Sequence, residues 1–184
     1  MKFFYNSVYE SEFTFYEKVF RYIWNVIYII LFKYSPRFCF AWRATILRLL
    51  GAKIGSRTKI YPKVKIWFPK NLTIGDGVII GDEANLYNVA PITLASEVTI
   101  SQEAFLCTAS HNIESPNREL ITSSITVDRG AWIFAGAFIS MGTQIGEGAV
   151  IGAKSVVIKN VEAFDVISGN PARVIKKRKA DWLN

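Results

Sequence analysis

Residues 127–157 read VDRGAW-IFAGAF-ISMGTQ-IGEGAV-IGAKSV-V, a six-residue repeat whose first position is always a large aliphatic residue. The fifth position of every complete hexad is small: Ala131, Ala137, Thr143, Ala149 and Ser155. A period of six fits neither an isolated α-helix nor a plain strand, but it fits a chain that turns a corner every six residues and stacks each coil on the one before. The aliphatic side chains then fill the interior, and Gly146 and Gly152 allow backbone turns that a Cβ atom would hinder.

The same period covers much of the remaining chain. It continues at Ile54, Ile60, Ile66, Ile74, Ile80, Leu86 and Ile92, and again at Leu94, Ile100 and Leu106. A small insertion at 67–72 breaks the phase, and residues 109–124 are polar, follow no period and are predicted to be a loop thrown out from the stack. Because three hexads make one triangular coil, we expect about five coils over residues 51–162, each rising about 4.8 Å.

Residues 1–50 differ from the rest of the chain in composition and do not follow the six-residue period. They contain the uncharged run Tyr22–Phe32, which is flanked by basic residues. The run is too short to span a bilayer as a helix, which takes about 20 residues. A secretory signal peptide is also disfavoured, since glutamates precede the run and no clear small-x-small cleavage site follows it. We therefore expect a helix that ends near Pro36, and a second helix over 38–50 with Gly51 as its C-cap.

Two interpretations of the first helix remain open. It packs on its own domain or on a neighbouring subunit, or it lies in the membrane interface with aromatic rings at headgroup level and basic residues among the phosphates. In the second case, residues 13–40 would make a peripheral membrane contact.

The net charge of +7 also requires an explanation. Basic residues form a run at 176–179 and decorate the first coils. They form solvated faces, or they meet a polyphosphate ligand such as a coenzyme or an anionic membrane surface. A nucleic-acid partner is not expected, because no helix-turn-helix, RNA-binding or zinc motif accompanies the charge. Cys39 and Cys107 follow no spacing pattern, which predicts buried thiols in a reducing compartment and neither a disulfide nor a metal site.

Several segments of the chain resemble the left-handed β-helix acetyltransferases and, within them, the group assigned to colanic acid biosynthesis. The matching segments are Trp42-Arg43, 49–55, 100–102, 106–108, Ser110-His111, 145–157 and 169–173. The resemblance covers about residues 13–178. It implies a mainly β fold, a left-handed parallel β-helix with N-terminal helices, an extended loop and a short C-terminal helix or tail. It also implies a homotrimer whose active sites lie between neighbouring prisms.

His111 is the single histidine of the chain and stands in the polar loop 109–124. Acetyl transfer from a thioester to a hydroxyl needs a base for the hydroxyl proton, and imidazole, with an ordinary pKa of about 6.5, accepts a proton near neutral pH. The resemblance therefore implies that His111 is the general base. Many family members have an acidic residue where this chain has Asn112, so the group that orients the imidazole stays open between Glu114 and a backbone carbonyl.

The resemblance also implies a coenzyme A site along one edge of the prism, closed by residues 163–184. Its predicted residues are Trp132, Ala135, Gly152, Ala153, Lys159, Arg173 and Lys176. Narrow corners at Gly152 and Ala153 would let the pantetheine arm approach backbone amides, while the three cations would meet phosphates. A core or interface role for Trp132 and a solvated tail for the cations are the alternatives. Asn88 is a candidate wall residue for the acceptor sugar, unless it hydrogen-bonds a turn.

These features predict an acetyl-CoA-dependent O-acetyltransferase that uses no metal and acts on a sugar of a bacterial surface polysaccharide, in the cytoplasm or at the inner face of its membrane. A lipid-linked oligosaccharide is one such acceptor. Another small acceptor, such as an antibiotic, serine or a free sugar, and a non-catalytic scaffold stay open. Carbonic anhydrases built on the same prism are disfavoured because their zinc needs three histidines. A nucleotidyltransferase is disfavoured because no nucleotide-binding unit precedes the hexads.

Overall fold

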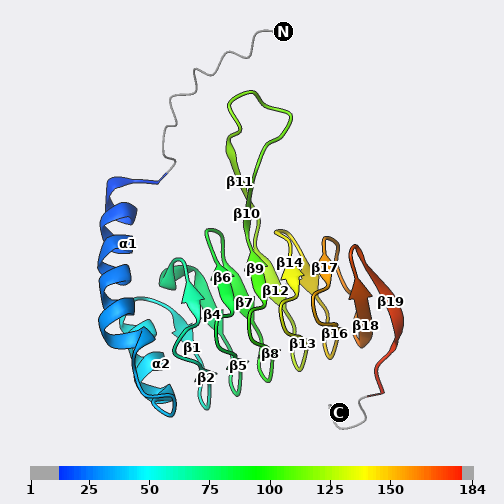
Figure 1. Cartoon of the computed structure of the whole chain (residues 1–184), viewed down its shortest axis with the longest axis horizontal. Coiled ribbons are helices and arrows are strands. Elements are labelled where there is room, and N and C mark those ends of the chain that lie inside the picture. The colour runs from blue at the N-terminus through cyan, green and yellow to red at the C-terminus, as the bar shows by residue number, and fades with distance from the viewer. Residues whose placement is uncertain (1–12, 180–184) are drawn as a thin grey trace.

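Each hexad forms a short strand followed by a corner, and three such strands make one coil of a three-sided parallel β-solenoid (Figure 1). The computed structural model describes residues 13–179. Residues 1–12 of the predicted segment 1–50 and residues 180–184 of the predicted segment 163–184 lie outside this range.

The strands stack in three sheets, one on each side of the solenoid. Sheet A contains β1 (Lys53–Ile54), β4 (Leu72–Ile74), β7 (Ile92–Leu94), β12 (Ile125–Val127) and β15 (Gln144–Ile145). Sheet B contains β2 (Lys59–Ile60), β5 (Ile79–Ile80), β8 (Thr99–Ile100), β13 (Trp132–Ile133), β16 (Val150–Ile151), β18 (Asp165–Gly169) and β19 (Ala172–Lys177). Sheet C contains β3 (Lys65–Ile66), β6 (Asn85–Tyr87), β9 (Phe105–Cys107), β14 (Phe138–Ile139) and β17 (Val156–Val157). Five complete coils result, and a sixth begins at Val161, which bridges Ile145 of sheet A, and continues into β18. The structure confirms the predicted mainly β, parallel solenoid fold.

The interior is the row of aliphatic residues that the repeat predicts. The structure buries Val127, Ile133, Ile139, Ile145, Ile151 and Val157, together with the small residue at the fifth position of each hexad. Burial of one such aliphatic side chain contributes about 1.5–3 kcal/mol to stability. A Cβ at Gly146 would lie 2.5 Å from the backbone nitrogen of Ala163, and a Cβ at Gly152 would lie 2.7 Å from Ser168 Oγ. Close stacking of the corners therefore requires glycine at both positions.

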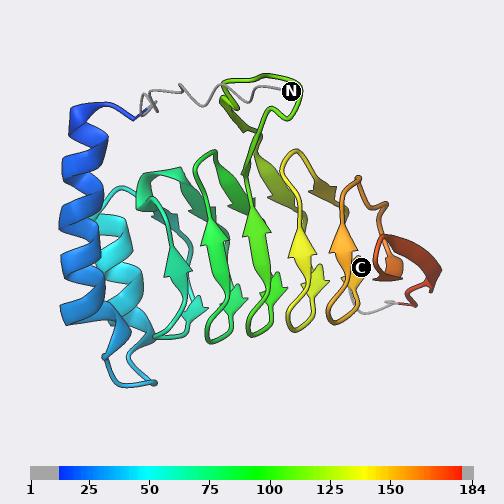
Figure 2. The same cartoon turned by 45° about the horizontal axis from the view of Figure 1, so that its top comes forward.

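Two helical segments close the N-terminal end of the solenoid (Figures 1 and 2). They are α1 (Phe15–Ile27), which continues as the π-helix η1 (Tyr28–Lys33), and α2 (Phe40–Leu49). A capping box between Thr14 and Glu17 starts α1. The inner face of α1 is held by Trp24, which is buried and whose Nε1 donates to the carbonyl oxygen of Ile66 at 2.7 Å. Gly51, at φ +91°, follows α2 in the left-handed conformation that we predicted for its C-cap.

Three departures from the period have distinct structures. The insertion after β3 contains a 3₁₀ turn, η2 (Pro69–Asn71). The polar loop forms a hairpin of β10 (Ala109–His111) and β11 (Leu120–Thr122). The C-terminal segment differs from the short helix or tail that we predicted, because β18 and β19 pair as antiparallel strands at the edge of sheet B. The β-branched pairs Val166-Ile167 and Val174-Ile175 favour this extended pairing over a helix.

The sequence predicted buried thiols at Cys39 and Cys107. Both are free thiols in the structure, but each is only half-buried, because each lies where the outer surface of its segment is partly open to solvent. Among the helices of residues 13–179, none has both the length and the apolar character that a bilayer crossing requires.

Candidate active site

His111 ends strand β10 on the hairpin that projects from the solenoid (Figure 1). Its Nδ1 lies 2.7 Å from the carbonyl oxygen of Arg118, across the hairpin. A carbonyl oxygen only accepts hydrogen bonds, so this contact assigns the proton of the neutral ring to Nδ1 and leaves Nε2 with a free lone pair. The sequence left the orienting group open between Glu114 and a backbone carbonyl, and the structure places the carbonyl of Arg118 in that position.

The tip of the hairpin is ordered by its own polar side chains. Asn112 Oδ1 accepts from the backbone N–H of Glu114 at 3.1 Å, and the backbone N–H of Asn112 donates to the carbonyl of Glu119. The hydroxyl of Ser115 donates to Glu119 Oε1 at 2.7 Å, and this bond holds the pKa of Glu119 below its ordinary value. Asn112 therefore shapes the turn at the tip of the hairpin.

Thr108 anchors the root of the hairpin, a role that sequence reasoning missed. Its buried hydroxyl donates to the carbonyl of Tyr87 at 2.8 Å and accepts from the N–H of Ala90 at 3.0 Å, both in the preceding coil. Its own carbonyl accepts from the N–H of Ser123, where the hairpin returns. The sequence shows a hydroxyl residue directly before the polar loop, which could have suggested an anchor. The carbonyl that this hydroxyl bonds, however, lies 21 residues away in sequence.

The predicted pantetheine contacts lie at the corners between sheets B and C. Ala135 belongs to the corner after β13, and Gly152 and Ala153 belong to the corner one coil further on. These corners stack directly, because the backbone N–H of Lys154 donates to the carbonyl of Ala135 at 2.9 Å. The structure therefore brings the three small residues together on one edge, where each remains at least partly exposed.

Trp132 lies on the outer face of sheet B beside this edge. Its indole is 41% exposed, its Nε1 donates to Ser101 Oγ at 3.2 Å, and its ring meets Phe134 edge-on at 4.8 Å between centroids. The strand register aligns Trp132 with Val150, Val166 and Lys176. Three strand spacings separate Trp132 from Lys176, a span of about 14 Å. An aromatic surface and a cation thus share one row of the sheet.

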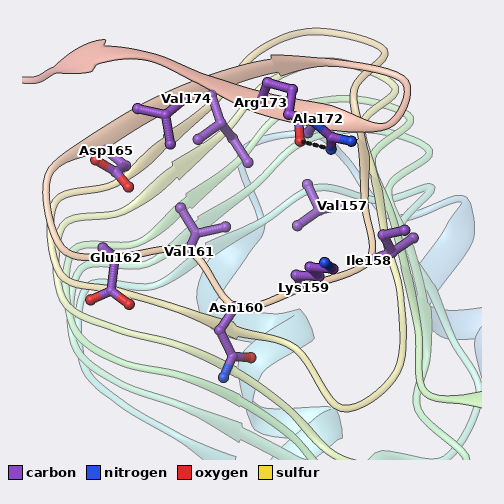
Figure 3. Close-up of a pocket in the computed structure, with 11 residues that line it drawn as sticks. Val157, Ile158, Lys159, Asn160, Val161, Glu162, Asp165, Ala172, Arg173 and Val174 are labelled. Atoms are coloured by element: carbon purple, nitrogen blue, oxygen red, sulfur yellow. Dashed lines mark hydrogen bonds between the residues drawn. The ribbon is translucent and has the colours of Figure 1, made fainter.

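Lys159 and Arg173 both line a hollow of about 450 Å³ at the C-terminal end of the solenoid (Figure 3). Apolar side chains of the last coil form much of its lining. Glu162 and Asp165 also line it, and Asp165 is paired with Lys177 at 2.8 Å. The described residues 13–179 contain no group of three or more histidine, cysteine or acidic side chains placed to hold a metal ion.

Comparison with known proteins decides the family. Although no protein-family model matches the sequence, the chain is 40% identical over 156 residues to an Escherichia coli K12 protein named "Putative colanic acid biosynthesis acetyltransferase WcaF", a match that covers 85% of this chain and 86% of that one. The chain belongs to the hexapeptide-repeat acetyltransferases. The solved structure of a hexapeptide-repeat acetyltransferase from Vibrio cholerae matches with a TM-score of 0.83 and 26% identity, covering 90% of this chain and 94% of that one. A structure of that Vibrio protein in complex with acetyl coenzyme A matches with a TM-score of 0.81 and 27% identity over 88% of each chain.

In this acetyltransferase, Asn88 lies inside a corner and not on the wall of a cavity. It is fully buried, and its Oδ1 accepts from the N–H groups of Trp67 and Phe68 at 2.9 and 3.0 Å. Its Nδ2 donates to the carbonyl of Phe68 at 2.8 Å. These bonds correspond to the turn role that the sequence left as the alternative to an acceptor contact.

A groove of about 390 Å³ lies between α1 and sheet C, and Asn88 is not among the residues that line it. Aromatic rings of Trp24, Tyr28, Trp67 and Tyr87 line it. Asn25, Lys65 and Asn85 also line it, and within residues 13–179 their side chains have no hydrogen-bond partner. The Nε1 of Trp67 is buried without a partner in the same part of the chain. Sequence reasoning missed this groove because its residues are distributed over four separate elements and two coils.

The acetyltransferase carries His111 and the small residues of its predicted coenzyme site on different edges of one solenoid, whereas Lys159 stands in the turn between β17 and Val161, on the same edge as the hairpin. The His111 hairpin leaves the corner between sheets C and A, whereas Ala135 and Gly152 lie at corners between sheets B and C. The outer face of sheet C separates the two edges. This face bears a ladder of ring contacts from Trp67 to Tyr87, Phe105 and Phe138, with centroids 4.8, 6.4 and 5.4 Å apart.

Proposed function

We propose that the protein transfers an acetyl group from acetyl-CoA to a sugar hydroxyl during the synthesis of a bacterial surface polysaccharide, with His111 as general base. The observation that carries this mechanism is the hydrogen bond between His111 Nδ1 and the Arg118 carbonyl, which leaves Nε2 free to accept a proton. The name of the Escherichia coli relative supports the pathway, and the acetyl-CoA complex of the Vibrio relative supports the donor. Such a donor fits action in the cytoplasm, where coenzyme A thioesters are made.

His111 would act twice in one turnover. Its Nε2 accepts the hydroxyl proton while the acceptor oxygen attacks the thioester carbonyl carbon, and the C–O bond forms. The C–S bond then breaks, and the imidazolium returns the proton to the leaving thiolate. The Nδ1–H bond to the Arg118 carbonyl persists through both steps, so it keeps the ring in place and its dipole favours the transient positive charge.

The donor would lie along the edge between sheets B and C. Ala135, Gly152 and Ala153 would admit the pantetheine arm close to the backbone, with Trp132 packed beside it. Lys159, Arg173 and Lys176 would meet the phosphates at the C-terminal end of the molecule. Support comes from the short side chains on this edge and from Lys159 and Arg173, which both line the hollow at the C-terminal end, with Lys176 further along β19.

The acceptor sugar would occupy the aromatic groove between α1 and sheet C. The apolar faces of sugar rings pack on aromatic side chains, and sugar hydroxyls pair with amide and ammonium groups. The groove offers both kinds of group, in the rings of Tyr28 and Tyr87 and in the unpaired side chains of Asn25, Lys65 and Asn85, as counted over residues 13–179. Tyr87 also connects the groove to the catalytic hairpin, because its carbonyl accepts from Thr108.

A homotrimer would complete the site. In one chain, His111 and the edge between sheets B and C, here called the coenzyme edge, lie on either side of sheet C. A neighbouring copy packed near this face would bring the hairpin of one chain to the coenzyme edge of the next. The face suits such a contact because its outward residues include Tyr87, Phe105 and Phe138, whereas sheet A presents lysine, threonine and glutamine to solvent.

Thiol release from acetyl-CoA tests the proposal directly. Purified protein, the His111→Ala variant and an Asn117→Ala control from the same hairpin would be mixed with acetyl-CoA and a panel of free and lipid-linked sugars. Loss of one general base lowers the rate by roughly 10²–10⁴-fold, so acceptor-dependent release should survive in the control and fall by this factor in His111→Ala. Equal release by parent and His111→Ala would remove His111 from the mechanism, and failure to bind acetyl-CoA would overturn the proposed donor.

A further inference from the structure

The outer face of the N-terminal helix presents large apolar side chains to the surroundings. This outer face consists of Phe15, Tyr16, Val19, Tyr22, Ile23, Val26, Ile29 and Ile30, all exposed among the described residues. Phe15, Tyr16 and Tyr22 are 75%, 83% and 72% exposed. A contiguous apolar surface of this kind marks an interaction site more often than an ordinary solvated face.

The outer face is distinct from the face that packs on the solenoid. Phe20, Trp24 and Phe32 hold the inner face, through ring contacts and the bond from Trp24 to Ile66. At about 100° per residue, Phe15 and Val26 fall on the side of the helix opposite Trp24. A helix that only capped the solenoid would be polar on this side. The sequence therefore specifies two apolar faces, and the solenoid covers one.

The charges around the outer face indicate its partner. Glu17 is the only acidic residue in the stretch 13–50, and the Thr14 hydroxyl and backbone N–H engage its carboxylate. The same stretch contains Lys18, Arg21, Lys33, Arg37, Arg43 and Arg48. Lys18 and Lys33 form no ion pair within residues 13–179. A second copy docked on this face in a two-fold contact would bring these cations toward one another, whereas anionic headgroups would neutralise them.

We infer that the outer face of α1 and η1 docks on an anionic phospholipid bilayer, with its aliphatic and aromatic side chains at the acyl boundary and Lys18 and Lys33 among the phosphates. Tyr16 and Tyr22 combine an apolar ring with a polar hydroxyl, which suits the headgroup level. The contact extends the open membrane interpretation of residues 13–40 to one defined face of one helix.

The docked orientation also sets the height of the His111 hairpin above the bilayer, and its consequence for the acceptor rests on the proposed function. Both views place α1 across the N-terminal end of the solenoid, so the coils would rise away from the bilayer (Figures 1 and 2). The His111 hairpin follows β9 in the third coil. Two coil spacings and one helix diameter set its root about 20 Å above the lipid surface. The acetylated sugar would then stand several units away from the lipid anchor of its acceptor.

Vesicle co-sedimentation of the full chain, without acetyl-CoA or acceptor, tests the docking. Tyr22→Glu/Val26→Glu would be compared with Lys53→Gln/Thr73→Glu on sheet A, which changes the net charge by the same amount at exposed positions. The parent and the sheet A control should bind vesicles containing phosphatidylglycerol, bind pure phosphatidylcholine vesicles more weakly, and lose affinity as salt rises. Tyr22→Glu/Val26→Glu should bind about tenfold more weakly or worse.

Equal binding by the two double variants, or no binding of the parent to any vesicle, would overturn the inference. Sedimentation velocity without lipid tests whether a second copy of the chain covers this face instead. A smaller assembly for Tyr22→Glu/Val26→Glu alone would mean that the face contacts a second copy, and would overturn the inference. Activity on a soluble sugar should be unchanged in both variants. Since vesicle binding needs no substrate, an inactive parent that still binds vesicles would refute the proposed function and leave the docking intact.

Discussion

At the scale of single residues, the shape of the edge between sheets B and C, where we propose that coenzyme A binds, depends on the absence of a Cβ at Gly152. Gly152 packs so closely on the next corner that a Cβ would lie 2.7 Å from Ser168 Oγ and 2.9 Å from Ser168 Cβ. The side chain of Ser168, and not solvent, therefore sets the shape of the edge where the pantetheine arm is proposed to bind. A change at Gly152 should affect stability through Ser168 and donor binding through the displaced corner.

We expect Gly152→Ala to lower the free energy of unfolding by about 1–3 kcal/mol, the usual cost of overpacking, and to raise KM for acetyl-CoA several-fold. Gly152→Ala/Ser168→Gly should recover part of the stability, because the two nearest atoms are removed. Chemical denaturation and initial rates measure the two effects separately. If KM stays at the parent value in Gly152→Ala, this corner does not hold the donor.

At the scale of elements, the His111 hairpin is an insertion whose direction is fixed by the contacts at its root. Thr108 bonds the carbonyl of Tyr87 and the N–H of Ala90, while Arg118 bonds His111 within the hairpin. Two separate sets of hydrogen bonds thus position the imidazole. The first, to the Arg118 carbonyl, holds the ring, and the second, made by Thr108, holds the strands of the hairpin. The bonds of Thr108 can be removed by a substitution that leaves His111 and its bond to Arg118 unchanged.

Thr108→Val keeps the shape of the side chain and removes both hydroxyl bonds. Because the N–H of Ala90 loses its acceptor, and the carbonyl of Tyr87 keeps only the bond from the backbone N–H of Thr108, we expect a loss of about 1–3 kcal/mol in stability, a several-fold lower kcat and an unchanged KM for acetyl-CoA. The matched control is Thr58→Val, since Thr58 is also buried and bonds the carbonyl of Gly55 in the first coil. An equal drop in kcat for both variants would contradict a positioning role for Thr108.

The repeated elements were predictable from the sequence, and the contacts between distant elements were not. A hexad constrains an aliphatic and a small residue together, so each strand and corner is specified locally. The amide of Asn88 meets the backbone of Phe68, and Thr108 meets Tyr87, only after whole coils have stacked. The C-terminal strands β18 and β19 likewise form on the edge of sheet B, which the local pattern does not reveal. The place of His111 on a projecting loop was predictable, because the single histidine of the chain stands in the polar stretch 109–124 that breaks the period.

At the scale of the whole molecule, the decisive question is whether one chain can catalyse alone. The hairpin and the coenzyme edge lie on different corners of the solenoid, with the ring ladder of sheet C between them. Lipid docking adds a second constraint. If prisms pack side by side with parallel axes, all copies of the outer face of α1 lie at one end and meet the same bilayer together, so assembly would strengthen membrane binding without any new contact.

Mixing two inactive variants tests the shared site. His111→Ala lacks the base, and Ala135→Glu would place a carboxylate where the donor is proposed to lie. Each should be inactive alone. Co-expressed in equal amounts with different tags, they should recover about a quarter of the parent activity, because a site between two chains draws each partner from a mixed pool and one combination in four is intact. A site contained within one chain predicts a different result, since every chain in the mixture carries a lesion and the mixed assembly would stay as inactive as its parts.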